Sequence, residues 1–239
     1  MRVTIHQPQF LPWLGYLDKI DRSDLFVVLD NVQFKKNDWQ NRNRIRTSEG
    51  WQWLTIPVRH RFGQLITEVQ INPEVDWRSK HLTALAMHYG AAPYASQYVE
   101  QLRVLYQQVW LHLVDLNMAV LCWLLQAFAI KTPLCLASEM KLRDNATDRL
   151  SDICREVGAT EYLAGPGAQE YMDIERFRRS GIRLQLQQFR HPIYPQCYQP
   201  FVPGMAAIDL LCNLGPSGIS TLRDARTGND EVNSTVAST

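Results

Sequence analysis

The sequence of 239 residues lacks the short motifs that mark several common enzyme classes. It contains neither a GxGxxG nor a GxxxxGK[ST] pattern, so a dinucleotide fingerprint and a P-loop are not predicted. Its five cysteines are scattered, without CxxC or zinc spacing, and we expect no metal site and no cofactor. Scattered cysteines in odd number are typical of reduced thiols, which predicts a cytoplasmic protein.

The chain also lacks a long apolar run and a strong net charge. The most apolar stretch, Met118–Ile130, is too short to span a bilayer and indicates a core helix. The net charge is +1, so no overall field attracts nucleic acid, and any basic site must be local. We therefore expect a small-molecule partner, no nucleic acid and no membrane span, while the oligomeric state stays open.

The order of the predicted elements indicates an α/β fold. A strand at Arg2–His6, a helix after Pro12 and a buried strand at Leu25–Asp30 favour parallel pairing. Alternation of strands and helices returns after residue 133, beyond a predicted helical insertion at about 77–130. We predict a doubly wound, mainly parallel Rossmann-like sheet in a single domain, residues 1–220, with a disordered polar tail at 221–239.

Within this frame, two local features are predicted. The stretches 51–58 and 65–71 are expected to be strands that pair with each other in antiparallel fashion. A helical hairpin is expected over about 94–130, with its break near 112–117. The Pro-rich segment Pro192–Pro203 cannot form regular helix or a central strand, so it is expected to cross the sheet end as an ordered lid.

Unusual polar stretches follow three of the predicted parallel strands. They are "HQPQFLPW" after the first strand, "DNVQFKK" after the second and "AGPGAQEY" after a later one. Ligands of doubly wound sheets bind beyond the carboxyl ends of the strands, so these stretches predict a site at one sheet edge.

The first stretch allows two interpretations. Gln7 and a helix that begins near Pro12 could bind an anion through free backbone N–H groups, with Gln7, Trp13 and Tyr16 as substrate-binding candidates. The turn could equally be a rigid proline-rich connection, with Trp13 and Tyr16 in the core.

The segment from Asp30 to Arg46 combines positive charge with amides and aromatic rings. Arginine offers a planar fork for carboxylate or phosphate, and amides suit hydroxyl groups. We interpret the segment as one wall of a pocket, against the alternative of a solvated basic surface. The candidate substrate-contacting residues are Gln33, Lys36, Trp39, Asn41, Arg42 and Asn43.

Candidates for proton transfer and nucleophilic attack are few. His81 and His88 lie seven residues apart on one predicted helix face, and His81 is the candidate general base, or else a structural histidine. Ser138 ends a predicted strand, but no GxSxG surrounds it, so a covalent mechanism has little support.

Three further residues are predicted to border the pocket. Gly165 would permit close backbone approach or a positive φ, and Tyr171 follows it at a helix start. Asp209 lies in an apolar helix, where it either compensates the helix N-terminus or pairs with a cation such as Lys36 or Arg42.

Taken together, these segments resemble the WbqC-like protein family over about Val3–Gly215. The resemblance rests on "HQPQFLPWLGYLDKI", "DLFVVLDNVQFKKNDWQNRNRI", "WLTIPV", "HYGAAPY", "AGPGAQEYMD" and "YPQCYQPFVPGMAAIDLLCNLGP". It implies a bacterial cytoplasmic protein that acts on activated or amino-modified sugars in surface-polysaccharide or other secondary pathways. Ala137–Ser138 replaces an expected pair of serines after the middle strand, and Met205–Ala206 replaces an expected Leu–Ser before the final helix, which places a serine-dependent mechanism in doubt.

The predicted function is a transferase that adds an acyl or aminoacyl group to an amine of a small substrate, such as a nucleotide-linked amino sugar. In this hypothesis His81, Lys36 and Arg42 are catalytic, and the other candidates orient the substrate. The alternatives are an accessory protein that binds a nucleotide or sugar without chemistry, and a nucleotidyltransferase, which the absence of an HxGH motif weakens. Spatially, Gln7, Arg42 and Gly165 should border one cavity.

Overall fold

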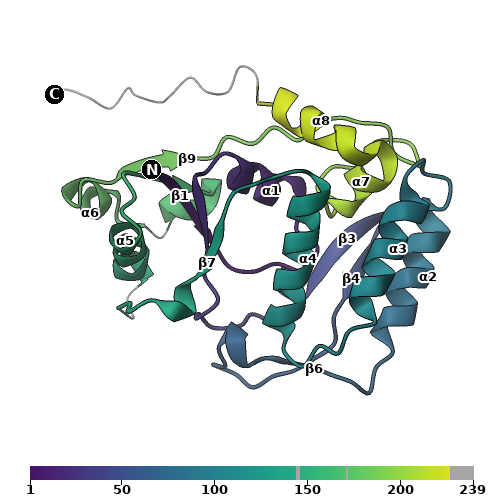
Figure 1. Cartoon of the computed structure of the whole chain (residues 1–239), viewed down its shortest axis with the longest axis horizontal. Coiled ribbons are helices and arrows are strands. Elements are labelled where there is room, and N and C mark those ends of the chain that lie inside the picture. Colours follow the sequence, from purple (N-terminus) through teal and green to yellow (C-terminus); the bar gives the residue numbers. More distant parts are fainter. Residues whose placement is uncertain (144–145, 171, 227–239) are drawn as a thin grey trace.

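A five-stranded parallel sheet forms one end of the molecule (Figure 1). The computed structural model describes residues 1–143, 146–170 and 172–226. The strand order is β7-β2-β1-β8-β9, and every neighbouring pair is parallel, which confirms the predicted Rossmann-like α/β fold. The strands are β1 (Arg2–His6), β2 (Leu25–Val28), β7 (Leu134–Leu136), β8 (Glu161–Ala164) and β9 (Arg183–Leu186).

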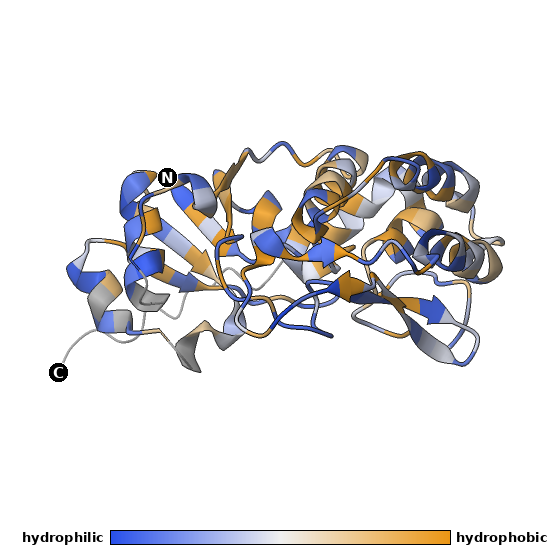
Figure 2. Cartoon of the chain, turned by 90° about the horizontal axis from the view of Figure 1, so that it is seen from below, coloured by the Kyte–Doolittle hydropathy of each residue, from blue (hydrophilic) through white to orange (hydrophobic). Residues whose placement is uncertain are grey.

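Helices cover both faces of this sheet because alternate strand residues point to opposite sides. Val3 and Ile5 pack with one apolar cluster that includes residues of α5 (Ala146–Glu156) and α6 (Ile174–Arg179). Phe26 and Val28 pack with the larger cluster, which includes residues of two helices, α1 (Leu14–Asp21) and α4 (Leu113–Ala127). Figure 2 shows apolar and polar residues alternating along the helices, as expected when one side of each helix packs on the core.

The remaining elements build the other end of the molecule. Here α2 (Trp77–Tyr89), α3 (Ala95–Tyr106) and α4 form the predicted insertion. The helical break lies at 107–112, slightly before the predicted position, because α4 already begins at Leu113. Short connections and late helices complete the chain: η1 (Ile66–Glu68), η2 (Ala137–Glu139), η3 (Pro166–Glu170), α7 (Ile208–Leu214), η4 (Gly215–Ser217) and α8 (Gly218–Asp224). No helix among the described residues is long and apolar enough to cross a membrane.

Two small antiparallel sheets lie outside the main sheet, and their pairing corrects the prediction. Strand β4 (Gly50–Thr55) pairs with β3 (Arg42–Thr47), a strand that the sequence analysis did not predict. Only the ends of the two predicted strands meet, as β5 (Val58–Arg59) and β6 (Gln70–Ile71). The physical reason is the alternation of the half-buried Arg42 and Arg44 with the buried Asn43 and Ile45, a period-two pattern typical of a strand.

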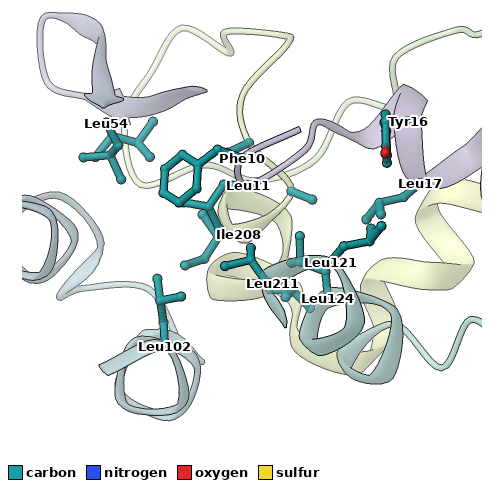
Figure 3. Packing of buried hydrophobic residues seen from close by; sticks show 14 of the residues in the cluster. Phe10, Leu11, Tyr16, Leu17, Leu54, Leu102, Leu121, Leu124, Ile208 and Leu211 are labelled. Carbon is teal, nitrogen blue, oxygen red and sulfur yellow. The ribbon is translucent and has the colours of Figure 1, made fainter. Parts of the chain in front are cut away.

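The turn after β1 enters the core. Phe10 and Leu11 are fully buried and lie beside Ile208 and Leu211 of α7 (Figure 3). Leu11 has a φ of 42°, a left-handed conformation that is unfavourable for a branched residue. The buried side chain of Asn43 donates to the Leu11 carbonyl at 2.7 Å and to the Phe10 carbonyl at 3.3 Å. This contact fixes the turn against the β3–β4 hairpin.

Part of the predicted tail is ordered. Helix α8 runs to Asp224, the Arg223 guanidinium donates to Asp21, and Arg226 donates to Asp18. These ion pairs, together with one from Arg226 to Asp21, hold residues 221–226 against α1. The rest of the predicted tail, 227–239, lies outside the described residues.

We expect Asn43→Ala to lower the free energy of unfolding by about 2–3 kcal/mol, because two carbonyl groups in the core lose their donor. Urea unfolding at pH 7.5 measures this loss. Gln107→Ala, at an exposed position after α3, is the control and should change stability by less than about 0.5 kcal/mol. Equal stability of Asn43→Ala and the control would contradict the clamping role of Asn43.

Candidate functional site

A crevice of about 390 Å³ opens at the carboxyl edge of the main sheet. It lies between β1 and β8. The strand order reverses here, because β2 and β7 lie on one side of β1 and β8 and β9 lie on the other. Ligands of open α/β sheets bind at such a switch point. The lining residues are Ile5, His6, Gln7, Leu29, Val32, Arg149, Leu150 and Tyr162.

Side-chain amides connect the edge of the crevice to the segment after β2. The carboxamide of Gln40 donates to the Gln7 side-chain oxygen at 2.7 Å, and the Phe10 amide donates to the Trp39 carbonyl at 3.0 Å. The polar segment therefore lies beside the turn after β1, as the sequence predicted for two stretches that follow parallel strands. Asn31 adds a bond from its side chain to the Ala137 carbonyl at 3.0 Å.

Asp30 joins the ends of β2 and β7. Its buried carboxylate accepts hydrogen bonds from the backbone amide of Ser138 at 2.9 Å and from the Ser138 hydroxyl at 2.6 Å. Because this hydroxyl donates to a carboxylate and no histidine ring bonds to it among the described residues, the pair serves to order the edge.

His6 lines the crevice, and the charge of Lys19 lies near its ring. Nδ1 of His6 lies 3.0 Å from the Gln7 carbonyl, and its ring meets Tyr16 edge-on. A carbonyl oxygen only accepts, so we assign the ring proton to Nδ1, which leaves Nε2 as the basic nitrogen. Burial and the nearby charge of Lys19 lower the pKa of His6 below its ordinary value. Lys19 is 2% exposed, and burial lowers its pKa to about 7.

Beyond the crevice, arginine and tryptophan side chains stack on one side of the β3–β4 hairpin. Arg42 lies 4.1 Å over the ring of Trp53, and Arg44 lies 5.4 Å from Trp39 and 5.1 Å from Trp51. The rings also contact one another, with centroids 5.6 Å apart for Trp39–Trp53 and 5.2 Å apart for Trp51–Trp53. We call these five residues the arginine–tryptophan face.

A buried carboxylate supports the hairpin from behind. Asp209 accepts hydrogen bonds from Tyr194 at 2.7 Å and from Gln196 at 2.9 Å, and the charge of Arg46 lies near it. Burial raises the pKa of Asp209, and these contacts offset part of the shift. Its cationic neighbour is thus Arg46, where the sequence suggested Lys36 or Arg42. The proline-rich segment contributes Pro200, whose carbonyl accepts from Arg46 at 2.8 Å.

Several predicted site residues lie away from the crevice. His81 is 4% exposed, and its two ring nitrogens lie 3.3 Å from the Tyr106 hydroxyl and 3.1 Å from the Thr55 carbonyl. Asn41 is buried and donates to the Ile56 carbonyl, so like Asn43 it supports the backbone. Lys36 and Gln33 are exposed at the surface of the segment after β2.

The remaining predictions concern the turn and the glycines. The ring of Trp13 covers Gly15 so closely that an added Cβ there would lie 2.3 Å from it, which closes the start of α1 to a ligand. Gly165 has ordinary φ and open space around its Cβ position, so no close approach requires glycine there. Of the three residues expected to border one cavity, Gln7 lines the crevice, Arg42 lies on the hairpin and Gly165 is not among the lining residues. Tyr171 lies outside the described residues.

Sequence reasoning passed over His6, Lys19 and Arg44. His6 is the last residue of a predicted strand, and that position alone places a side chain at the carboxyl edge. Arg44 follows Arg42 at strand spacing, which signals a shared face. Lys19 gave no signal, because a lysine near a helix end is ordinarily exposed. No cluster of potential metal ligands occurs among the described residues.

Comparison with known proteins identifies the family. The model of the WbqC-like protein family matches residues 7–221. The chain belongs to this family. It is also 36% identical, over 229 residues, to the uncharacterized protein Rv1507c of Mycobacterium tuberculosis, a match that covers 94% of this chain and 99% of the relative. No solved structure matches the chain. The hairpin and the segment before it fall within the part that the family model covers, as do the residues that line the crevice except Ile5 and His6.

We predict that His81 makes folding sensitive to acid. Burial lowers the pKa of His81 from 6.5 to about 4, so between these values the unfolded chain binds a proton that the folded protein does not. Stability should therefore fall as the pH drops from 6.5, by about 2 kcal/mol at pH 5 from this residue.

Urea unfolding of wild type and His81→Gln at pH 7.5 and pH 5 tests this prediction. The variant lacks the titrating ring, so the loss of stability between the two pH values should be smaller in it, even if it is less stable at pH 7.5. An identical loss in both proteins would show that His81 does not contribute to the acid response.

Proposed function

We propose that the protein is a transferase that joins an acyl or aminoacyl group to an amine of a small activated substrate, such as a nucleotide-linked amino sugar. The observation that carries the proposal is the crevice at the switch point of the sheet, which joins apolar walls to a few polar groups. Ligand sites of enzymes typically have this composition and a volume of roughly 300–1,000 Å³. The structure of the edge, with Gln7 held by Gln40, supports preorganised substrate contacts.

The reaction forms an amide bond. The amine nitrogen attacks the carbonyl carbon of an activated acyl donor, the bond from that carbon to the leaving group breaks, and the leaving group departs with its electron pair. The nitrogen must lose one proton, and we assign His6, which lines the crevice, as the acceptor through its Nε2. Its pKa is low because the ring is enclosed and Lys19 is close. An anionic substrate bound nearby would raise that pKa and so favour proton transfer.

This assignment replaces His81 by His6 as the proposed proton acceptor. His81 packs among Phe10, Trp77 and Tyr106, in the core between α2 and the hairpin. His6, by contrast, lines the crevice directly. The carboxamide of Gln7 is proposed to orient the carbonyl or the amine, since it offers a donor beside the oxygen that Gln40 engages.

The test is an incubation of the purified protein with pairs of activated acyl donors and nucleotide-linked amino sugars, with the amide product detected by mass spectrometry. We expect one pair to give product, and His6→Asn to lower kcat by a factor of about 100 or more, because removal of a general base costs that much. His81→Gln is the matched control and should retain activity at pH 7.5.

Three outcomes would contradict the proposal. Saturable binding without product from any pair would indicate an accessory protein that only binds its ligand. Release of pyrophosphate from a nucleoside triphosphate would indicate nucleotidyl transfer. Full activity of His6→Asn would remove the assigned proton acceptor.

A further inference from the structure

The arginine–tryptophan face carries positive charge that no carboxylate balances. Arg42 and Arg44 take part in no ion pair within the described part of the chain. Two carboxylates lie near the face: Asp38 accepts from the Trp39 amide and pairs with Lys35, and Asp209 lies near Arg46. Other arginines have carboxylate partners, for example Arg2 with Glu161 and Arg223 with Asp21. Two unpaired guanidinium groups on one face repel each other, so a bound anion would stabilise the arrangement.

The stacking also decides which atoms a ligand could reach. Both guanidinium groups lie over the faces of indole rings, and a cation in this position can still donate hydrogen bonds from its N–H groups. Nε of Arg42 and Nε of Arg44 are buried and have no hydrogen-bond partner, so the terminal nitrogens are the donors that a ligand would reach. Arg44 uses one of these in a 3.2 Å bond to the Gly204 carbonyl. Guanidinium edges held in this way are the donor geometry that binds oxyanions in two places.

The spacing indicates which anion would fit. Arg42 and Arg44 are two residues apart on β3, so their backbones are separated by about 7 Å along the strand. Oxygens on the two phosphates of a diphosphate can reach both groups, whereas a single carboxylate reaches one. Trp51 is 43% exposed at the rim, and its ring is available to stack on a planar base.

The face is joined to the crevice by one short segment. Trp39 belongs to the face, and its carbonyl bonds to Phe10; the next residue, Gln40, bonds to Gln7 in the crevice wall. A substrate whose diphosphate lies on the face could thus extend its other end along this segment toward His6.

We propose that the arginine–tryptophan face binds the diphosphate of a nucleoside diphosphate-linked substrate, with Arg42 and Arg44 on the phosphates and Trp51 against the base. The inference deepens the proposed function, because it assigns the part of the amine substrate that the protein holds, and a role of this binding in catalysis rests on that function. Binding itself is independent of turnover. The hairpin β3–β4 is the element that carries this site (Figure 1).

The experiment measures binding of uridine and thymidine diphosphate sugars to the full chain by titration calorimetry and by tryptophan fluorescence. We expect saturable binding with a change in fluorescence, because three indoles lie at the site. Arg42→Gln and Arg44→Gln should each raise Kd at least tenfold, and raised salt should weaken binding of the wild type. Arg59→Gln is the matched control, an exposed strand arginine paired with Glu74, and should leave Kd unchanged.

Loss of the stack could also unfold the hairpin, so circular dichroism melts accompany each variant. Arg42→Lys keeps the charge and loses the fork, and it should give a Kd between those of wild type and Arg42→Gln. Wild-type affinity in a folded Arg42→Gln or Arg44→Gln, or no saturable binding of any nucleoside diphosphate sugar, would overturn the proposal. Equal affinity for inorganic pyrophosphate would overturn it in favour of a plain anion site, and tighter binding of a single-stranded RNA would overturn it in favour of a nucleic-acid surface.

The two proposals fail separately. Diphosphate binding that depends on Arg42, without turnover of any acyl donor, would support this inference and overturn the proposed function. Turnover with an unchanged KM in Arg42→Gln would support the function and overturn this inference.

Discussion

The hydrogen bonds from Asn43 to the carbonyls of Phe10 and Leu11 hold together the two halves of the candidate site. On one side of this contact is the turn that leaves the central strand β1, and on the other is the hairpin that carries the stacked arginines. The Asn43 donor satisfies the buried carbonyl groups of this turn and so helps to offset the strain of the left-handed conformation of Leu11. The position of the hairpin relative to the sheet edge follows from that single side chain and the apolar residues packed around it.

The fold could be predicted from the sequence because its signals are local. Short β-branched strands separated by helices identify a parallel sheet, and the edge where polar stretches gather follows from topology alone. The hairpin could not be predicted as easily. The strand formed by Arg42, Arg44 and Arg46 was not predicted, because the polarity of the segment obscured its strand-like spacing. Arg42 and Arg44 lie over tryptophan rings of the partner strand, and this cross-strand contact has no local signature.

The candidate site was harder to predict than the fold, because polar residues have two uses. Asn41, Asn43 and His81 have the side chains of substrate-binding residues, but the structure uses them to satisfy backbone groups and a tyrosine inside the protein. Buried polar groups require partners, and sequence does not show which ones will be buried. Lys19 is a second example: it is buried because neighbouring elements cover α1, and its own sequence context gives no sign of this burial.

The ion pairs of Arg223 and Arg226 with α1, together with the pairing of β1 with β8, have a consequence for how the molecule assembles. Strand β1 pairs with β8, which lies about 160 residues later in the chain, and helix α1 contacts α8, the last helix. Bringing such distant partners together costs conformational entropy before their contacts contribute favourable energy, and this slows folding. During synthesis the opening third, with its apolar strands and helix, therefore spends a long interval without its covering elements, and this interval is when the protein most needs protection from aggregation.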